Sequence, residues 1–163
     1  MQRYLYRGVN PALHEATAGK LIPKATGVPF KRSTNWGDFK WGDGTTWGES
    51  EVNAVIQHQR DSGKYHTSGV STTPSLENAK RYATYDGKYK SGYVYKIDAN
   101  LLGKYRVSSY SVAAHATSPV IPGDEEVILV GEDFGALPSE IVVEVLEVES
   151  HNLPMRGDAE AAR

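Results

Sequence analysis

The sequence contains no cysteine among its 163 residues. A disulfide, a thiolate nucleophile, a cysteine-ligated zinc site and an iron–sulfur cluster are therefore excluded. The five histidines show no His-x-x-x-His or similar spacing, so no metal site is expected. A domain of this length buries about 70% of the surface that its unfolded chain exposes, so its core needs neither disulfide nor metal to form.

Long apolar runs and several common motifs are also missing. No stretch approaches the roughly 20 apolar residues of a membrane-spanning helix. The opening residues, Met-Gln-Arg-Tyr-Leu-Tyr-Arg, lack the apolar core of a secretory signal. We therefore expect no membrane partner and an action in the cytoplasm of the producing or the target cell. The sequence holds neither the Gly-x-Ser-x-Gly motif of a serine hydrolase nor the Gly-Lys-Ser/Thr of a phosphate-binding loop.

The composition is that of a globular domain, 39% hydrophobic and 23% charged, with 16 glycines and 8 prolines. We expect one domain over 1–151 and a disordered tail over 152–163. The charge is uneven, since 1–110 hold 16 Lys and Arg against 9 Asp and Glu, whereas 111–163 hold 2 against 11. Either the surface is polarised, with an anionic ligand near its basic part, or these charges pair across the fold.

Hydrophobic periodicity predicts helices in the first half of the chain and mainly strands in the second, which is an α+β order. A helix is expected after Thr73, which offers an N-cap, with Pro74 as its first residue. The other expected helices are 12–18 and 49–59, and the expected strands are 4–9, 70–72, 93–97, 104–108, 126–130 and 141–148. Residues 22–48, rich in Gly and Pro and containing all three Trp, are predicted to form a long loop.

Three short segments carry residue types suited to chemistry. Segment 5–8 places Arg7 at the end of an apolar strand, segment 66–73 leads from a histidine into a Ser-Thr-Thr run, and segment 122–129 opens a strand with three acidic residues. Taken singly, each has an ordinary explanation: a surface ion pair, a helix cap and a solvated turn. Their order and content together carry more information.

Together they resemble the arginine–serine–glutamate class of mono-ADP-ribosyltransferase toxins, the class of the cholera and pertussis catalytic subunits. Tyr6-Arg7 is similar to the first strand of that class, His66-x-x-Gly69-x-Ser71-Thr72-Thr73 to its Ser-Thr-Ser strand, and Asp124-Glu125-Glu126-Val127 to its acidic-x-Glu motif. The resemblance covers most of 4–147, although 24–62 find no counterpart. It implies an ADP-ribosyltransferase fold, with two packed, mostly antiparallel sheets and flanking helices.

The resemblance implies NAD as co-substrate, with Glu126, Asp124 and Ser71 as the catalytic residues. Breaking the bond between nicotinamide and ribose develops positive charge on the sugar, and a carboxylate stabilises that charge. Glu126 would do so while bonding the ribose hydroxyls, and Ser71 would hold Glu126 in position. Asp124 would orient or deprotonate the acceptor. The class carries Glu or Gln where this chain has Asp124, so the choice of acceptor stays open.

The same resemblance assigns residues that bind NAD: Arg7, Gly8, His66, Thr72, Tyr82 and Tyr85. Arg7 would contact the pyrophosphate or hold the site through bonds to the neighbouring strand. The backbone of Gly8 would meet the nicotinamide amide. His66 would contact the adenosine side or shape the pocket, unless it is a structural histidine. One of Tyr82, Tyr85 and Tyr89 would stack on a ring, or these tyrosines pack in the core.

The implied activity is transfer of ADP-ribose to an intracellular macromolecule by a toxin, effector or defence component, with release of nicotinamide. The acceptor is a protein side chain or a nucleic acid, RNA or DNA. The Trp-rich segment 30–47 suits a single-stranded nucleic acid, a flat protein surface or a satellite core. A toxin made inside a bacterium would need a neutralising antitoxin or immunity protein. Two alternatives stay open: an NAD glycohydrolase, in which water replaces the acceptor, and an inactive binding module.

Overall fold

The computed structural model describes residues 3–27, 30, 32–34, 48–50, 67–111 and 125–150, with only the backbone considered at 32–34 and 48–50. Several predictions lie outside these residues. They concern Asp124, His66, most of the Trp-rich segment 30–47, residues 51–59 of the helix expected over 49–59, and the tail 152–163.

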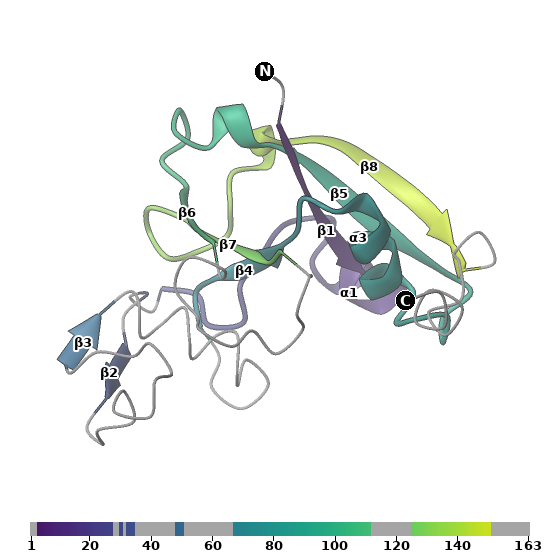
Figure 1. Ribbon diagram of the computed structural model, residues 1–163, viewed down its shortest axis with the longest axis horizontal. Helices are drawn as coiled ribbons and strands as arrows, with labels where there is room; N and C mark the ends of the chain where they lie inside the picture. The colour runs from purple at the N-terminus through teal and green to yellow at the C-terminus, as the bar shows by residue number, and fades with distance from the viewer. Residues whose placement is uncertain are drawn as a thin grey trace.

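The described strands form two three-stranded sheets and one separate ladder, all antiparallel (Figure 1). The first sheet has the order β1-β5-β8, with β1 at Tyr4–Val9, β5 at Ser91–Asp98 and β8 at Val142–Glu149. The second has the order β4-β7-β6, with β4 at Val70–Thr72, β7 at Val127–Val130 and β6 at Ser108–Ser111. The ladder pairs β2, Arg32–Thr34, with β3, Gly48–Ser50.

In the part of the chain that the structure describes, two α-helices and two short 3-10 helices accompany these strands. They are α1 at Pro11–Ala16, α3 at Leu76–Ala83, η2 at Ala99–Leu101 and η3 at Ser139–Ile141. The predicted α+β class with mostly antiparallel sheets is therefore confirmed. Within the described part of the chain, no helix is long and apolar enough to cross a membrane.

The two larger sheets share one hydrophobic core. Leu5 of β1 and Ile97 of β5 belong to the same buried cluster as Val70 of β4 and Leu129 of β7. Because side chains alternate between the faces of a strand, Arg7 lies on the same face of β1 as Leu5 and is directed toward this core. Burial of this apolar surface holds the sheets against each other.

Among the described residues, one isolated backbone bridge joins the two larger sheets, between Tyr6 of β1 and Thr73, the residue after β4. The amide of Tyr6 donates to the carbonyl of Thr73 at 2.8 Å, and the amide of Thr73 donates to the carbonyl of Tyr6 at 2.9 Å. Beyond this bridge each strand pairs within its own sheet, β1 with β5 and β4 with β7. We call the place where β1 and β4 part, with Arg7 and Gly8 on one side and Ser71 on the other, the fork.

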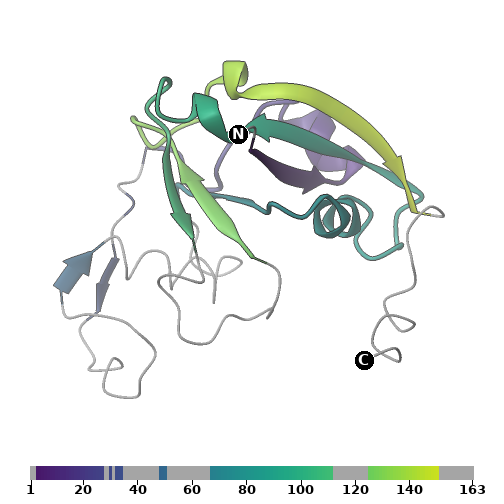
Figure 2. The same ribbon diagram turned by 45° about the horizontal axis from the view of Figure 1, so that its top comes forward.

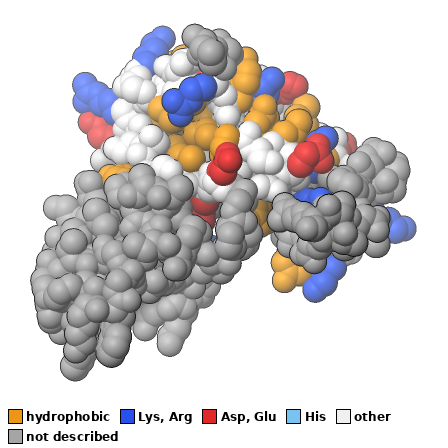
Figure 3. All heavy atoms as spheres, viewed as in Figure 1, with side chains coloured by type: hydrophobic (Ala, Val, Ile, Leu, Met, Phe, Trp, Pro, Cys, Tyr) orange, Lys and Arg blue, Asp and Glu red, His pale blue; other side chains and the backbone are white. Residues whose placement is uncertain are grey.

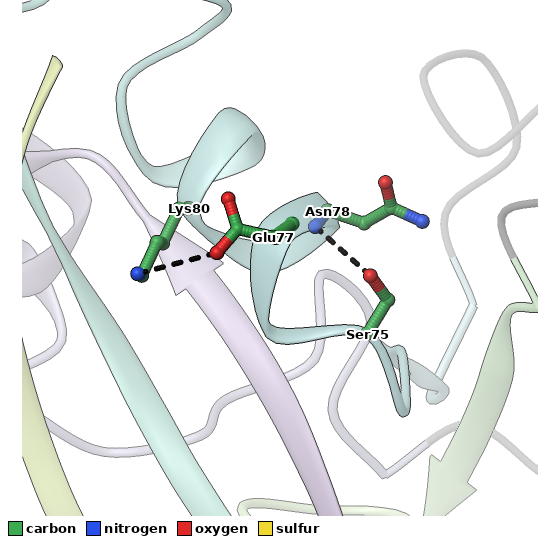
Figure 4. Close-up of polar contacts among 4 residues, drawn as sticks. All are labelled: Ser75, Glu77, Asn78 and Lys80. Carbon is green, nitrogen blue, oxygen red and sulfur yellow. Dashed lines mark hydrogen bonds and ion pairs between the residues drawn. The ribbon is translucent and has the colours of Figure 1, made fainter. Parts of the chain in front are cut away.

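Helix α3 begins later than predicted, because Ser75 and not Thr73 caps it. The hydroxyl of Ser75 accepts a hydrogen bond from the amide of Asn78 at 3.2 Å, and Lys80 pairs with Glu77 at 3.4 Å (Figure 4). Thr73 cannot serve as the N-cap, since its backbone groups are used by the bridge to Tyr6. Its hydroxyl instead accepts from the amide of Ser75 at 3.1 Å and so shapes the turn before the helix.

Helix α3 packs unusually close to one face of the β1–β5–β8 sheet (Figure 2). A Cβ atom added at Gly8 would collide with the carbonyl of Ala79, and one added at Gly92 would collide with the carbonyl of Ala83. Ala79 and Ala83 are themselves fully buried. Small residues on both surfaces therefore allow the helix backbone to approach the strands, and the sheet requires glycine at these two positions.

Two predicted elements are wrong in detail. The strand expected over 104–108 is a turn, because Arg106 adopts a left-handed backbone with φ of 55° and the amide of Val107 donates to the carbonyl of Leu102 at 2.9 Å. β6 begins only at Ser108. The helix expected from residue 49 starts instead as strand, since Glu49 is paired opposite Ser33 in the β2–β3 ladder.

Charges of opposite sign from the basic and acidic parts of the chain meet in the fold. Arg106 pairs with Glu132 at 2.9 Å, and Lys96 of β5 lies opposite Glu144 of β8 in the ladder. On the face shown in Figure 3, Lys and Arg side chains are interspersed with Asp and Glu side chains. Among the described residues, Arg106 and Glu132 therefore pair across the fold, as the second of the two alternatives expects.

The close packing of α3 predicts different costs at two glycines. We expect Gly92→Ala to lower the free energy of unfolding by about 1–3 kcal/mol, because α3 must move away from the sheet. Gly103→Ala should change it by less than about 0.5 kcal/mol, since an added Cβ there meets no atom within 4 Å. Urea unfolding followed by circular dichroism measures both. Equal stability of the two variants would contradict the packing described here.

Candidate active site

Ser71 and Glu126 meet on one face of the β4–β7–β6 sheet. Ser71 pairs with Ile128, and Glu126 precedes Ile128 by two residues, so strand alternation directs both side chains to the same face. The hydroxyl of Ser71 donates to Oε2 of Glu126 at 2.8 Å. The serine thus fixes the carboxylate through a charge-assisted hydrogen bond.

Glu125, immediately before Glu126, has a left-handed backbone conformation with φ of 54°. This conformation is unfavourable for a residue with a Cβ atom, and such strained positions often accompany functional sites. The left-handed backbone at Glu125 places the two neighbouring carboxylates in different surroundings. Glu125 is exposed, whereas Glu126 is partly buried against Ser71. The geometry therefore favours Glu126 over Glu125 as the acid of the site.

Arg7 connects β1 to this pair across the fork. Its Nη1 donates to the carbonyl of Ser71 at 3.1 Å. Burial lowers the pKa of the Arg7 guanidinium from its usual value, and the negative charge of Glu126 raises it again, as does Tyr95 to a smaller extent. Of the two roles expected for Arg7, the structure shows the bond to the neighbouring strand. Arg7, Ser71 and Glu126, far apart in sequence, thus form one connected polar cluster.

Gly8 and Thr72 flank this cluster but are used by the fold. The missing side chain of Gly8 makes room for Ala79 of α3, which accounts for glycine at this position without a ligand. Thr72 is 4% exposed, and its hydroxyl donates to the carbonyl of Val127 at 2.7 Å. Strand alternation directs the Thr72 side chain away from the face that carries Ser71 and Glu126. The contact of Thr72 with NAD stays a prediction that its side-chain geometry does not favour.

The two tyrosines expected to bind NAD lie in and after α3. Tyr82 is 42% exposed and Tyr85 58%. The ring of Tyr85 contacts Tyr89, with centroids 6.3 Å apart, and Lys88, whose Nζ lies 4.6 Å from the Tyr85 centroid. Among the described residues, these contacts do not connect Tyr85 to Arg7, Ser71 or Glu126. Core packing is excluded for both tyrosines by their exposure, and ring stacking on NAD stays a prediction.

The sequence patterns do not predict a hydrogen-bonded pair beside Arg7, His14 and the buried Tyr95. Tyr95 of β5 lies opposite Arg7 in the β1–β5 ladder, and its hydroxyl shares a hydrogen bond of 2.6 Å with Nδ1 of His14 in α1. No local sequence pattern predicts a contact between two residues that are 81 positions apart. The aromatic alternation of 93–97 does predict a strand, and it is the pairing register that brings Tyr95 to Arg7. In the described parts of the chain, no group of three or more His, Asp and Glu is arranged to hold a metal ion.

The structure thus brings together a glutamate, the strand serine that holds it and a partly buried arginine on the adjoining strand. Comparison with known families gives one match, and it covers most of the chain. The NarE family model matches residues 4–129, which include Arg7, Ser71 and Glu126, and the chain belongs to this ADP-ribosyltransferase-like family. No curated protein matches the chain.

Removal of two hydroxyl groups, one in β4 and one shortly before it, is predicted to have opposite effects on the free energy of unfolding. Thr72→Val removes the donor to the Val127 carbonyl and should lower the free energy of unfolding by about 1 kcal/mol. Ser68 is 1% exposed and its hydroxyl has no hydrogen-bond partner among the described residues. Ser68→Ala should therefore leave stability unchanged or raise it by up to about 1 kcal/mol, since a buried unpaired hydroxyl is unfavourable. Thermal unfolding of both variants measures the difference, and a larger loss for Ser68→Ala would be inconsistent with it.

Proposed function

We propose that this protein is a mono-ADP-ribosyltransferase that transfers ADP-ribose from NAD to an intracellular macromolecule and releases nicotinamide. The observation that carries the proposal is the connected cluster of Arg7, Ser71 and Glu126, in which the serine holds the carboxylate at 2.8 Å. Membership of the ADP-ribosyltransferase-like NarE family supports it independently.

In the proposed reaction, the bond between the ribose C1′ and the nicotinamide nitrogen breaks, and nicotinamide leaves as a neutral molecule with the bonding electron pair. Positive charge develops on the ribose as this bond lengthens. The Glu126 carboxylate stabilises that charge most effectively when its orientation is fixed beforehand, which the Ser71 hydroxyl accomplishes. The acceptor then bonds to C1′ and gives up a proton. We assign that proton to Asp124, two residues before Glu126.

Arg7 and the backbone of Gly8 supply complementary binding groups at the fork. The guanidinium carries five N–H donors in a planar arrangement suited to phosphate oxygens, and one of them bonds Ser71. The backbone groups of Tyr6 point toward β4, and strand alternation points those of Gly8 the same way. The amide and carbonyl of Gly8 therefore face the fork, where we propose that they meet the carboxamide of nicotinamide.

The biological setting is part of the proposal. The chemistry fits a toxin, effector or defence component acting on a protein or nucleic acid in the cytoplasm, with an antitoxin or immunity protein protecting a producing cell. NAD glycohydrolysis requires the same Glu126 and replaces the acceptor with water. The absence or presence of a labelled acceptor separates these two reactions.

Two neighbouring carboxylates provide a matched test of catalysis. Glu126→Gln should lower the rate of nicotinamide release by about 10²-fold or more, because the charge that stabilises the ribose is lost. Glu125→Gln changes the exposed neighbour in the same way and should leave the rate within about two-fold. Initial rates with purified protein measure both, and melting temperatures establish that the variants are folded. Full activity of Glu126→Gln would refute the assignment of this residue.

The acceptor is identified with biotin-labelled NAD and a cell lysate. Label that survives protease but is lost to nuclease indicates a nucleic acid, and the reverse indicates a protein. A parallel reaction without lysate measures free nicotinamide, and release without any transferred label indicates a glycohydrolase. Absence of NAD consumption in every reaction would contradict the enzymatic proposal.

A further inference from the structure

Beyond the cluster of Arg7, Ser71 and Glu126, Arg7 also has a neighbour on the other side, in β5. Arg7 and Tyr95 are direct partners in the β1–β5 ladder. Directly opposed residues in antiparallel strands have Cβ atoms about 4.5–5.5 Å apart, so their side chains lie next to each other on the same face. Tyr95 is 0% exposed and packs in the core shared by the two sheets. It therefore forms a fixed wall beside the Arg7 side chain.

The position of the Tyr95 ring is set by His14 in α1. The Tyr95 hydroxyl and Nδ1 of His14 share a hydrogen bond of 2.6 Å. The imidazole is itself held by stacking on Tyr93, with ring centroids 3.8 Å apart and an angle of 15° between the planes. Tyr93 and Tyr95 are two residues apart on β5, so they present the same face of the strand to His14. One histidine thus contacts both the ring opposite Arg7 and the next ring on the same face of β5.

Helix α1 keeps His14 in place. The side chain of Asn10 caps the helix by accepting from the amide of Leu13 at 2.7 Å, and Pro11 follows the cap at the first turn. At the other end, the hydroxyl of Thr17 donates to the carbonyl of Leu13 at 2.9 Å. These local bonds fix a short helix directly after the strand that carries Arg7.

The electrostatics of Arg7 and Tyr95 are coupled. Burial raises the pKa of the Tyr95 phenol, while the Thr17 hydroxyl and the positive charge of Arg7 lower it. The phenol therefore keeps its proton and can form the hydrogen bond with His14. A neutral Tyr95 side chain next to Arg7 can therefore fix the position of Arg7 without neutralising its charge.

We propose that Tyr95 and His14 are positioning residues for Arg7, which orient its guanidinium at the fork and thereby set the affinity for NAD. In the proposed function Arg7 binds the pyrophosphate, so the effect on affinity rests on that function. The orientation of Arg7 itself does not, and it can be measured in the absence of NAD. Removing the hydrogen bond of 2.6 Å between His14 and Tyr95 should shift the Tyr95 ring within its core packing and disturb Arg7.

Two variants break this hydrogen bond from opposite sides. Tyr95→Phe removes the hydroxyl and keeps the ring, whereas His14→Phe removes Nδ1 and keeps a ring that can stack on Tyr93. The double variant removes both partners of one bond. If the bond is what matters, the double variant should be no more impaired than either single variant, since the two changes are not independent. It should also recover stability relative to His14→Phe, because it has no buried Tyr95 hydroxyl that has lost its His14 partner.

Tyr93→Phe is the matched control. It removes a hydroxyl from the same face of the same strand and keeps the ring stacked on His14. Among the described residues the Tyr93 hydroxyl forms no hydrogen bond, so its removal leaves the contact between His14 and Tyr95 intact.

The first readout is the NMR signal of the Arg7 Nε–H group in the free protein. We expect His14→Phe and Tyr95→Phe to shift this signal and Tyr93→Phe to leave it unchanged. His14→Phe is decisive, because in the described part of the chain the contacts of His14 reach Arg7 through Tyr95, its partner in the ladder. An unchanged Arg7 signal in folded His14→Phe would overturn the proposal, whether or not the protein turns over NAD.

The second readout separates KM from kcat at a temperature where every variant is folded. Loss of one positioning hydrogen bond should raise the apparent KM for NAD about five-fold, with kcat within about two-fold, because Arg7 binds the ground state. The double variant should regain melting temperature but keep the raised KM. A KM that returns to normal together with stability would show a purely structural role and overturn the proposal. Wild-type protein without NAD turnover would count against the proposed function alone, since the Arg7 signal still tests the positioning.

Discussion

The hydrogen bond from Arg7 to the carbonyl of Ser71 is the interaction on which the site depends, because it spans the fork between the two sheets. A buried guanidinium is unfavourable unless oxygens and negative charge surround it. Here Ser71 and Glu126 provide that environment. The same groups that make burial of the arginine tolerable are those that hold the carboxylate. Stability of the fork and geometry of the site are therefore two consequences of one set of contacts.

The Ser71-Thr72-Thr73 run shows how a strand divides three tasks among adjacent residues. Ser71 faces Glu126, Thr72 points the other way and bonds the Val127 carbonyl, and Thr73 uses its backbone to bridge to Tyr6. This division follows from the two-residue period of a strand and from the backbone bridge between Thr73 and Tyr6, which joins the two sheets. A motif of similar hydroxyl residues therefore contains one residue oriented toward chemistry and two that maintain the fork.

Local sequence patterns predicted the strands that build the fork, and the family resemblance predicted that Ser71 holds Glu126. What they missed depends on partners that are distant in sequence. Thr73 has the residue type of a helix cap, but its backbone is used by the bridge to Tyr6. The pattern of residues 104–108 is typical of a strand, but the left-handed backbone of Arg106 turns the chain there. The pair of His14 and Tyr95 depends on register and helix placement, which periodicity does not encode.

The contacts of the fork join residues that are very far apart along the chain: 64 positions for Arg7 and Ser71, 55 for Ser71 and Glu126, and 81 for His14 and Tyr95. Such long-range contacts form slowly, since closing a large loop costs conformational entropy before the contact can stabilise it. A nascent chain on the ribosome that has not reached residue 126 has no carboxylate to place beside Ser71. Synthesis from the amino terminus therefore delivers the arginine and the serine first and the acid last, so translation itself delays the appearance of a complete site.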